Sequence, residues 1–181
     1  MKIRCVTLTE EYLELIREWR MREDITKYMN TDPKITSDQQ KEWFHKVSKD
    51  ETQHHWIVLV DEVPSGVINV FDIDRTNDRC SWGYYVANNE VRSLKLALTL
   101  EWSIYEYVFN TLKLHKLCNE TFVENKQVVK LHLLCGGHED GIMKEHIYKN
   151  GQYFDVSIGS ILDYEWEKKK QTIQFDRIVF E

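Results

Sequence analysis

The stretch from Ser81 to Ala97 carries the clearest chemical signal, because a glycine-containing strand leads there through a polar loop into a long helix. The loop reads Asn-Asn-Glu-Val-Arg-Ser-Leu-Lys-Leu-Ala over residues 88–97. The first amides of a helix lack hydrogen-bond partners and the helix dipole favours negative charge, so such a junction can bind a phosphate group. An ordinary strand-to-helix connection with exposed basic residues is the alternative interpretation.

Motifs of several other enzyme classes are absent. The chain contains no Gly-x-x-x-x-Gly-Lys-Ser/Thr, no Gly-x-Gly-x-x-Gly after a strand and no Gly-x-Ser-x-Gly. Two pairs have ligand types suited to a metal, His54 with His55 and Cys135 with His138, but each is half a site. Adjacent histidines on a strand also point to opposite faces. We therefore expect no metal.

Composition predicts one globular domain over residues 1–181. The 181 residues are 42% hydrophobic and 30% charged, with only 7 Gly and 2 Pro, which is not the composition of a disordered or collagen-like chain. The 24 basic and 30 acidic residues give a net charge of -6. This balance argues against nucleic acid and anionic membranes as partners and favours small molecules or other proteins.

The sequence also predicts a cytoplasmic location. The longest apolar run, Trp56–Val60, is far shorter than the roughly 20 residues of a membrane-spanning helix. Glu10 and Glu11 interrupt the N-terminal region before an export signal could form. The 4 cysteines contain no Cys-x-x-Cys pair and are interpreted as free thiols in a reducing compartment.

Hydrophobic periodicity and turn residues predict the elements of the first half. Capping boxes at Thr7–Glu10 and Ser37–Gln40 indicate the starts of two helices. Gly83 lies inside a predicted strand and is a candidate bulge. The predicted strands are 2–8, 54–60, 67–73 and 79–87, and the predicted helices end near Arg22 and Val47.

The second half begins with the strongest amphipathic helix, over residues 93–110, with Ala97, Leu100, Ile104 and Val108 on one face. Gly136 and Gly137 predict the end of a helix over 125–134. The remaining expectations are strands at 116–123, 142–148 and 153–162, a solvated turn at 168–170, and a last strand at 172–180 within a C-terminal piece 167–181. The order βααβββαβαββ predicts a mixed α/β fold with helices on both faces of a central, mostly antiparallel sheet.

The order of elements and two loop patterns resemble the GNAT superfamily of acetyl-CoA-dependent N-acetyltransferases. The pyrophosphate loop of that family has the form Arg/Gln-x-x-Gly-x-Gly/Ala, to which Arg92 and Ala97 correspond, while Lys95 stands at the middle glycine. The segment 125–132 followed by Gly136 is similar to the Asn…Tyr/His…Gly-Phe signature, with Gly137 in place of the aromatic residue.

Within the family, the chain is most similar to the N-acetyltransferases of pseudaminic acid biosynthesis, which act on a UDP-linked 4-amino-4,6-dideoxy sugar. The matching pieces run from the N-terminal part to about Trp166. They include Trp19-Arg20, Trp82-Gly83-Tyr84-Tyr85, Leu114-His115-Lys116-Leu117 and Tyr153-Phe154-Asp155-Val156.

The resemblance implies acetyl-CoA as co-substrate, held by the strand and loop before the long helix and by Asn125. A half-buried aromatic strand and a helix cap at Asn125 are the structural alternatives. The implied cofactor-binding residues are Tyr84, Tyr85, Val86, Val91, Arg92, Ser93, Leu94, Lys95, Leu96, Ala97 and Asn125. Lys95 either obstructs the approach of phosphate to the backbone or supplies a cation to it.

The resemblance also implies two catalytic roles. His132 stands where the family has the residue that protonates the departing thiolate, and an imidazole can donate to a thiolate downhill. Glu120 is the leading candidate for the base, followed by Asp72 and Asp74. A surface histidine and solvated strand carboxylates are the alternatives.

The acceptor is expected to be the 4-amino group of a UDP-linked deoxy amino sugar. Arg20, Tyr28 and Trp82 would form its pocket, with Trp43 as a further aromatic candidate. Aromatic core packing is the alternative for the aromatic residues, and an exposed helix charge is the alternative for Arg20. A protein N-terminus or a polyamine is the alternative acceptor, and a non-catalytic acyl-CoA-binding domain is the alternative class. Some relatives form homodimers, so a homodimer is possible here.

Overall fold

The computed structural model describes residues 1–181 and contains one seven-stranded sheet in the order β1-β2-β3-β4-β5-β7-β6. All neighbouring strands are antiparallel except β4 and β5, which are parallel. The predicted mixed, mostly antiparallel sheet is therefore confirmed. The strands are β1 (Ile3–Thr7), β2 (His54–Val60), β3 (Val63–Asp74), β4 (Arg79–Val86), β5 (Lys116–Phe122), β6 (His138–Lys149) and β7 (Gln152–Leu162).

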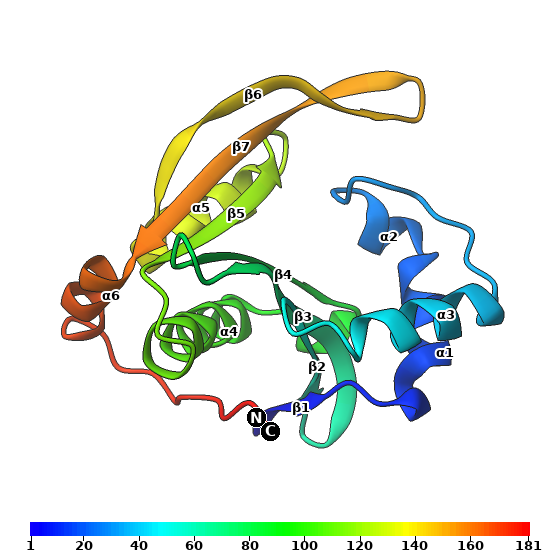
Figure 1. Cartoon of the computed structure of the whole chain (residues 1–181), viewed down its shortest axis with the longest axis horizontal. Helices are drawn as coiled ribbons and strands as arrows, with labels where there is room; N and C mark the ends of the chain where they lie inside the picture. The colour runs from blue at the N-terminus through cyan, green and yellow to red at the C-terminus, as the bar shows by residue number, and fades with distance from the viewer.

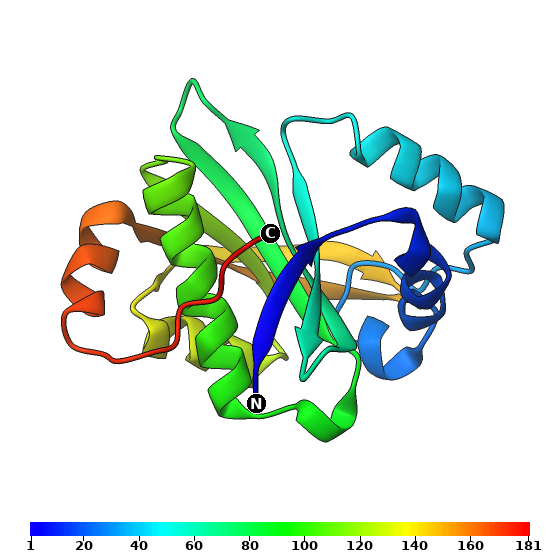
Figure 2. The ribbon, with the colours of Figure 1, turned by 90° about the horizontal axis from the view of Figure 1, so that it is seen from below.

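Helices cover both faces of the sheet, as the sequence predicts (Figures 1 and 2). The α-helices are α1 (Leu13–Arg20), α2 (Glu23–Thr26), α3 (Ser37–Val47), α4 (Leu94–Glu106), α5 (Lys126–Cys135) and α6 (Asp163–Lys170). Two 3-10 turns, η1 (Glu10–Tyr12) and η2 (Asn89–Val91), precede α1 and α4, and the π-helical turn η3 (Tyr107–Thr111) extends α4. The helices α2 and α6 are additions to the predicted order.

Two hydrophobic clusters hold the helices to the sheet. Alternate residues of β2 point to opposite faces, so Val58 joins the larger cluster under α4, with Leu100 and Ile104, while Ile57 joins the smaller cluster with Ile16 of α1. Each fully buried aliphatic side chain contributes about 1.5–3 kcal/mol relative to an exposed one. The packing fixes α4 across one face and α1 across the other.

The capping boxes differ from the predictions. The box at α3 is formed by Thr36 and Gln39, one residue earlier than predicted. No box forms at Thr7, because Thr7 is the last residue of β1 and its hydroxyl donates to the carbonyl oxygen of Glu181 at 2.7 Å. Gly136 ends α5 in the left-handed conformation, with φ 107°, and this prediction is confirmed.

The predicted bulge at Gly83 is wrong. Gly83 pairs regularly with Asn69 of β3, and the irregularity between these strands lies between Phe71 and Asp74. The irregularity that matters is on the other edge of β4, where pairing with β5 stops after Ser81. From Trp82 to Val86 the two parallel strands separate, and the edge of β4 that faces β5 has no ladder partner.

The C-terminal expectations are also corrected. Residues 168–170 are the last turn of α6 rather than a solvated turn. Residues 172–180 form no strand, because only an isolated parallel bridge joins Phe180 to Cys5 of β1. The chain ends beside the C-terminal part of β1, where the backbone of Glu181 pairs with Cys5 and Thr7, as Figure 2 shows. No helix has the length and apolar character needed to cross a membrane.

Candidate active site

A groove of about 420 Å³ opens where β4 and β5 separate. Its walls come from these two strands, from α2 and the residues after it, from the loop before α4, and from the first two turns of α5. The lining residues are Asp24, Ile25, Tyr28, Met29, Trp82, Gly83, Tyr84, Tyr85, Val86, Arg92, Ser93, Ala97, Asn119, Glu120, Thr121, Asn125, Gln127, Val128 and His132.

The β4 wall offers unpaired backbone groups together with aromatic side chains. Trp82 and Tyr84 stack with ring centroids 5.7 Å apart and planes 12° apart. Burial raises the pKa of the Tyr84 and Tyr85 hydroxyls well above the ordinary value, so both remain protonated donors at neutral pH. A linear ligand with amide groups can pair with this edge as an added strand would.

The loop before α4 forms one end of the groove. Ser93 caps the helix, its hydroxyl accepting from the amide of Leu96 at 3.2 Å. Arg92 is fixed by donating to the carbonyl oxygen of Val86 at 2.8 Å and to Asp24 at 3.3 Å. The amides of Leu94 and Lys95 precede the first hydrogen bond of the helix and remain free for an anion.

His132 of α5 forms part of the groove floor and is 8% exposed. Its Nδ1 lies 2.8 Å from Oε1 of Glu101, a fully buried residue of α4. The ring also packs edge-on against Trp82, with centroids 5.5 Å apart. Because Glu101 occupies Nδ1, Nε2 is the ring nitrogen that remains for a molecule in the groove.

Glu120 and Asn125 line the groove from β5 and from the start of α5. Glu120 is exposed, and its carboxylate takes part in none of the side-chain hydrogen bonds and ion pairs of the structure. Asn125 stands at the N-cap of α5, yet its side chain makes no capping hydrogen bond. Both side chains are therefore free to contact a ligand.

Five of the predicted residues do not line the groove. The side chain of Leu96 is buried in the main core and Val91 packs against that core, while Leu94 and Lys95 are exposed on the first turn of α4. Arg20 ends α1 outside the lining, and its Nε is buried without a partner.

Further candidates of the sequence also lie elsewhere. Trp43 packs edge-on against His55, with centroids 5.3 Å apart, and Asp74 holds the turn after β3 through Thr76 and Asn77. Asp72 lies on β3 and does not line the groove.

Several site residues carried a signal that the sequence analysis missed. Asn119 and Thr121 lie two and four residues after Leu117 on β5, and residues two apart on a strand point to the same face. Glu101 lies four residues after Ala97 and three before Ile104, within the predicted apolar face of the helix. A carboxylate on a buried face usually has a specific partner. Asp24, Ile25 and Met29 had no such signal, because their place depends on how α2 packs.

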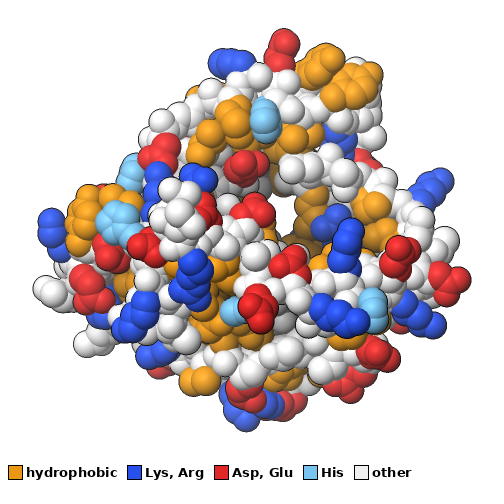
Figure 3. All heavy atoms as spheres, viewed as in Figure 1, with side chains coloured by type: hydrophobic (Ala, Val, Ile, Leu, Met, Phe, Trp, Pro, Cys, Tyr) orange, Lys and Arg blue, Asp and Glu red, His pale blue; other side chains and the backbone are white.

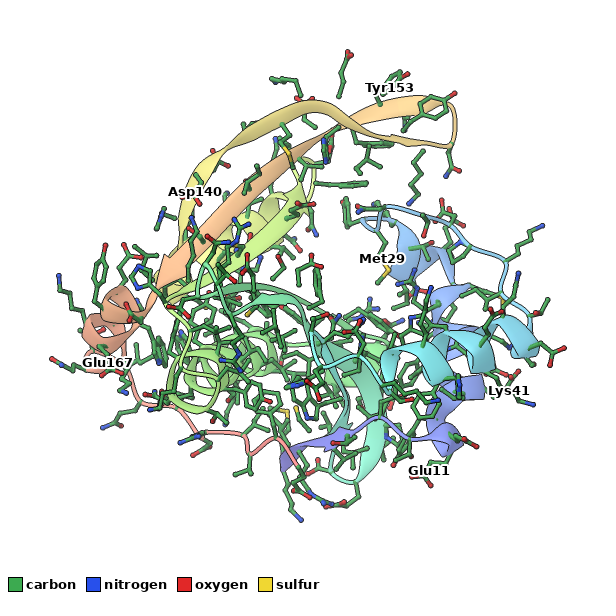
Figure 4. All side chains as sticks on the ribbon, in the orientation of Figure 1. Glu11, Met29, Lys41, Asp140, Tyr153 and Glu167 are labelled. Atoms are coloured by element: carbon green, nitrogen blue, oxygen red, sulfur yellow. The ribbon has the colours of Figure 1, made fainter.

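The hairpin of β6 and β7 arches beyond the groove without contributing to its lining. Figure 1 shows it arching from the sheet towards α2, and Figure 3 shows an opening through the molecule beneath it. In Figure 4, Tyr153 lies at the tip of the hairpin and Met29 lies below it, beside α2. The ammonium of Lys149 donates to the carbonyl oxygens of Thr26 at 2.7 Å and Met29 at 3.0 Å, so the arch is closed by hydrogen bonds.

No group of three or more His, Cys, Asp or Glu side chains is arranged to hold a metal ion. Comparison with protein families matches residues 2–138 to an acetyltransferase (GNAT) domain. The match covers both the groove and the loop before α4.

Individual relatives agree with this match. The chain is 25% identical to spermidine N(1)-acetyltransferase of Vibrio cholerae over 160 residues, which cover 88% of this chain and 92% of the relative. It is 28% identical to acetyltransferase PseH of Campylobacter jejuni over 125 residues, covering 69% and 76%. A solved structure of the Vibrio cholerae spermidine N-acetyltransferase, in complex with CoA and spermine, superposes with a TM-score of 0.86 at 24% identity, covering 91% and 98% of the two chains.

Proposed function

The chain belongs to the GNAT acetyltransferase family and is an acetyl-CoA-dependent N-acetyltransferase, and we propose that its acceptor is the 4-amino group of a UDP-linked deoxy amino sugar. The proposal concerns the identity of the acceptor and the residues that bind the two substrates and transfer protons.

The charge of the groove is the observation that carries this choice. Only two acidic side chains line it, Asp24 and Glu120. Asp24 is paired with Arg22 at 2.7 Å and with Arg92 at 3.3 Å, and the Arg22 guanidinium holds the pKa of Asp24 below its ordinary value. Glu120 is thus the one carboxylate free to meet an ammonium group. An acceptor with a single amine fits this groove better than a polyamine with several.

The remaining lining supports a polar, largely uncharged acceptor. Asn119, Thr121 and Gln127 offer neutral hydrogen-bonding groups, as an amino sugar with hydroxyl and amide substituents requires. Tyr28 is 41% exposed and presents an aromatic face on which a base can stack. Arg20 lies outside the lining, with its Nε buried and unpartnered, and stays a prediction from the family resemblance.

Acetyl-CoA fits the unpaired edge and the helix start. In the proposal, residues Trp82–Val86 pair with the amide-bearing arm of the co-substrate, and Asn125 supports it from the other wall. The free amides of Leu94 and Lys95, with the exposed ammonium of Lys95, meet its phosphates. The co-substrate supplies an acetyl group activated as a thioester.

Two side chains complete the proposed proton balance. As the bond from acceptor nitrogen to acetyl carbon forms, Glu120 takes the proton that the amine loses, directly or through a water. As the carbon–sulfur bond breaks, Nε2 of His132 returns a proton to the sulfur. The acetyl group moves and no net proton is consumed by the transfer.

A polyamine is the second candidate acceptor. The specific observation in its favour is the match to a spermidine N(1)-acetyltransferase over 88% of this chain, together with the free carboxylate of Glu120. Polyamine acetylation would require carboxylates from outside the groove lining to meet the other ammonium groups.

A cytoplasmic location belongs to the same proposal, because the four cysteines are free and three of them are buried, as is typical of reducing compartments. A homodimer stays a prediction from the family resemblance.

Release of free CoA thiol tests the acceptor. Purified protein is given acetyl-CoA with UDP-4-amino-4,6-dideoxy-N-acetyl-β-L-altrosamine, with spermidine, or with a peptide bearing a free N-terminus. We expect thiol release with the sugar nucleotide and much less with the others. Faster turnover of spermidine or of the peptide would replace the sugar nucleotide as acceptor.

A further inference from the structure

A buried carboxylate lies directly behind the groove, beyond the residues that line it. Glu101 is 0% exposed and projects from the middle of α4. Its Oε1 accepts from the hydroxyl of Tyr105 at 2.5 Å and faces Nδ1 of His132 at 2.8 Å. Its Oε2 is buried with no hydrogen-bond partner.

This placement needs a reason beyond packing. Burying a carboxylate completely, as at Glu101, costs several kcal/mol unless hydrogen bonds or an opposite charge compensate it. An aliphatic or amide side chain would fill the same space at lower cost. The partner that reaches the groove is His132, since Tyr105 is itself fully buried.

We propose that Glu101 is a positioning residue for acetyl transfer: its carboxylate holds Nδ1–H of His132, directs Nε2 into the groove, and favours the imidazolium that donates a proton to the departing thiolate. The inference rests on the proposed role of His132 as the acid and adds the residue that makes the role possible. With Nδ1–H donated to the carboxylate, the neutral ring presents an unprotonated Nε2 to the groove, so Nε2 donates a proton only when the ring is the imidazolium that the carboxylate favours.

The surroundings of the pair set the sign of the pH dependence. The titratable groups around it are Tyr105 on α4, Cys135 on α5, Tyr84 on β4 and, more distantly, Lys169 on α6. Burial, with a further contribution from Glu101, raises the pKa of the Cys135 thiol and of both phenols above the ordinary values. These three groups are therefore neutral at physiological pH, and Glu101 is the negative charge nearest to the ring.

Glu101→Gln is the direct test, because it keeps the size of the side chain and removes its charge. A glutamine stabilises the imidazolium less than a carboxylate does, so proton donation from Nε2 to the departing thiolate should become slower. We expect kcat at neutral pH to fall at least tenfold, the KM for acetyl-CoA to change less than twofold, and the alkaline limb of the kcat profile to move to lower pH.

A readout independent of turnover accompanies the kinetics. An NMR titration of ¹⁵N-histidine-labelled protein follows the ring of His132, assigned by its loss in His132→Phe. We expect the wild-type ring to keep its proton on Nδ1, facing Glu101, and the ring in Glu101→Gln to show a larger share of the Nε2–H tautomer. Tyr105→Phe is the matched control, because it removes the other donor to Oε1 and keeps the carboxylate; its kcat should stay within about threefold of wild type.

The outcomes separate this inference from the proposed function. Unchanged kcat and an unchanged His132 titration in Glu101→Gln, in a protein that His132→Phe inactivates, would overturn the role of Glu101 alone. Full activity of His132→Phe would instead overturn the acid assignment on which it rests. A thermal unfolding curve for each variant identifies misfolding. If Glu101→Gln does not fold, Glu101→Asp replaces it, because the shorter side chain keeps the charge but withdraws it from Nδ1. Glu101→Asp should lower kcat and move the pH profile of kcat less than Glu101→Gln would.

Discussion

The ammonium of Lys149, at the end of β6, lies 2.7 Å from the carbonyl oxygen of Thr26 in α2, although the two residues are 123 positions apart in the sequence. The side chain of Lys149 is only 6% exposed and also lies 3.2 Å from Asp32. The neighbouring Asn150 donates to the same carboxylate at 2.6 Å. This contact joins the tip of the β6–β7 hairpin to α2 and fixes the residues that follow α2, among them Tyr28 and Met29, which line the groove.

Lys149→Met should therefore loosen α2 and the residues after it, where we propose that the acceptor binds, more than β4 and the start of α4, where we propose that acetyl-CoA binds. The substitution leaves the Thr26 and Met29 carbonyls without their buried donor, and each such loss costs about 1–3 kcal/mol. We expect the KM for the acceptor to rise about tenfold and the KM for acetyl-CoA to change little, as measured by steady-state kinetics. Lys144→Met is the matched control, since Lys144 is 76% exposed and pairs only within the hairpin, with Asp155. Equal effects of the two variants would contradict the role of the arch.

Substitution of Lys95 tests how the start of α4 binds the phosphates of acetyl-CoA. It is exposed on the first turn of α4 and forms no ion pair, so its ammonium is available to an anion at the helix start. We expect Lys95→Ala to raise the Kd for acetyl-CoA about threefold to fivefold at low ionic strength, and less in high salt, as measured by calorimetry. Tighter binding by Lys95→Gly than by wild type would show instead that the lysine obstructs the backbone.

The fold was predictable from the sequence where local signals agree with tertiary packing. The apolar face of 93–110 and the glycine stop at Gly136 both led to correct elements, because periodicity and a left-handed cap are local properties. The strand expected at 172–180 was wrong, because alternation alone does not supply an edge to pair with: β1 is five residues long and accepts only one bridge from Phe180.

The site was predictable only in part. Residues that the resemblance maps onto β4, β5 and α5 come together in the groove. Arg20 does not line it, because the end of α1 packs beside β4 rather than over the opening. The ion pair between Asp24 and Arg92 joins residues 68 positions apart, and no local pattern indicates it. The separation of β4 and β5 after Ser81 is likewise a property of the whole sheet.

The buried ring of His55 should make the folded protein less stable in mild acid. Burial, and to a smaller extent neighbouring His54, lower the pKa of His55 to about 4 from the ordinary value of 6.5. Below pH 6.5 the unfolded chain binds a proton that the folded protein takes up only near pH 4, so stability falls as pH drops through this window.

In urea unfolding at pH 7.5 and 5.0, His55→Gln should lose about 2 kcal/mol less stability than wild type on acidification. Its amide can still reach the side-chain oxygen of Gln53, which lies 2.8 Å from Nε2 of His55. His146→Gln, at an exposed histidine of β6, should behave as wild type. If the unfolding free energy of His55→Gln falls on acidification as much as that of wild type, other groups cause the acid sensitivity.

Glu120 and Glu124 offer a matched pair for the proposed base. Both are exposed, but only Glu120 lines the groove, and its carboxylate has no internal partner to satisfy. If Glu120 accepts the amine proton, Glu120→Gln should lower kcat about 10²-fold with little change in the KM for acetyl-CoA, because general base catalysis typically contributes 10²- to 10⁴-fold. Raising the pH should restore part of the rate, since a growing fraction of the acceptor then arrives already deprotonated. Glu124→Gln should keep the wild-type rate and pH profile. A Glu120→Gln variant that is slow at every pH would point to acceptor binding rather than proton transfer, because loss of a binding contact is not relieved by deprotonating the amine in solution.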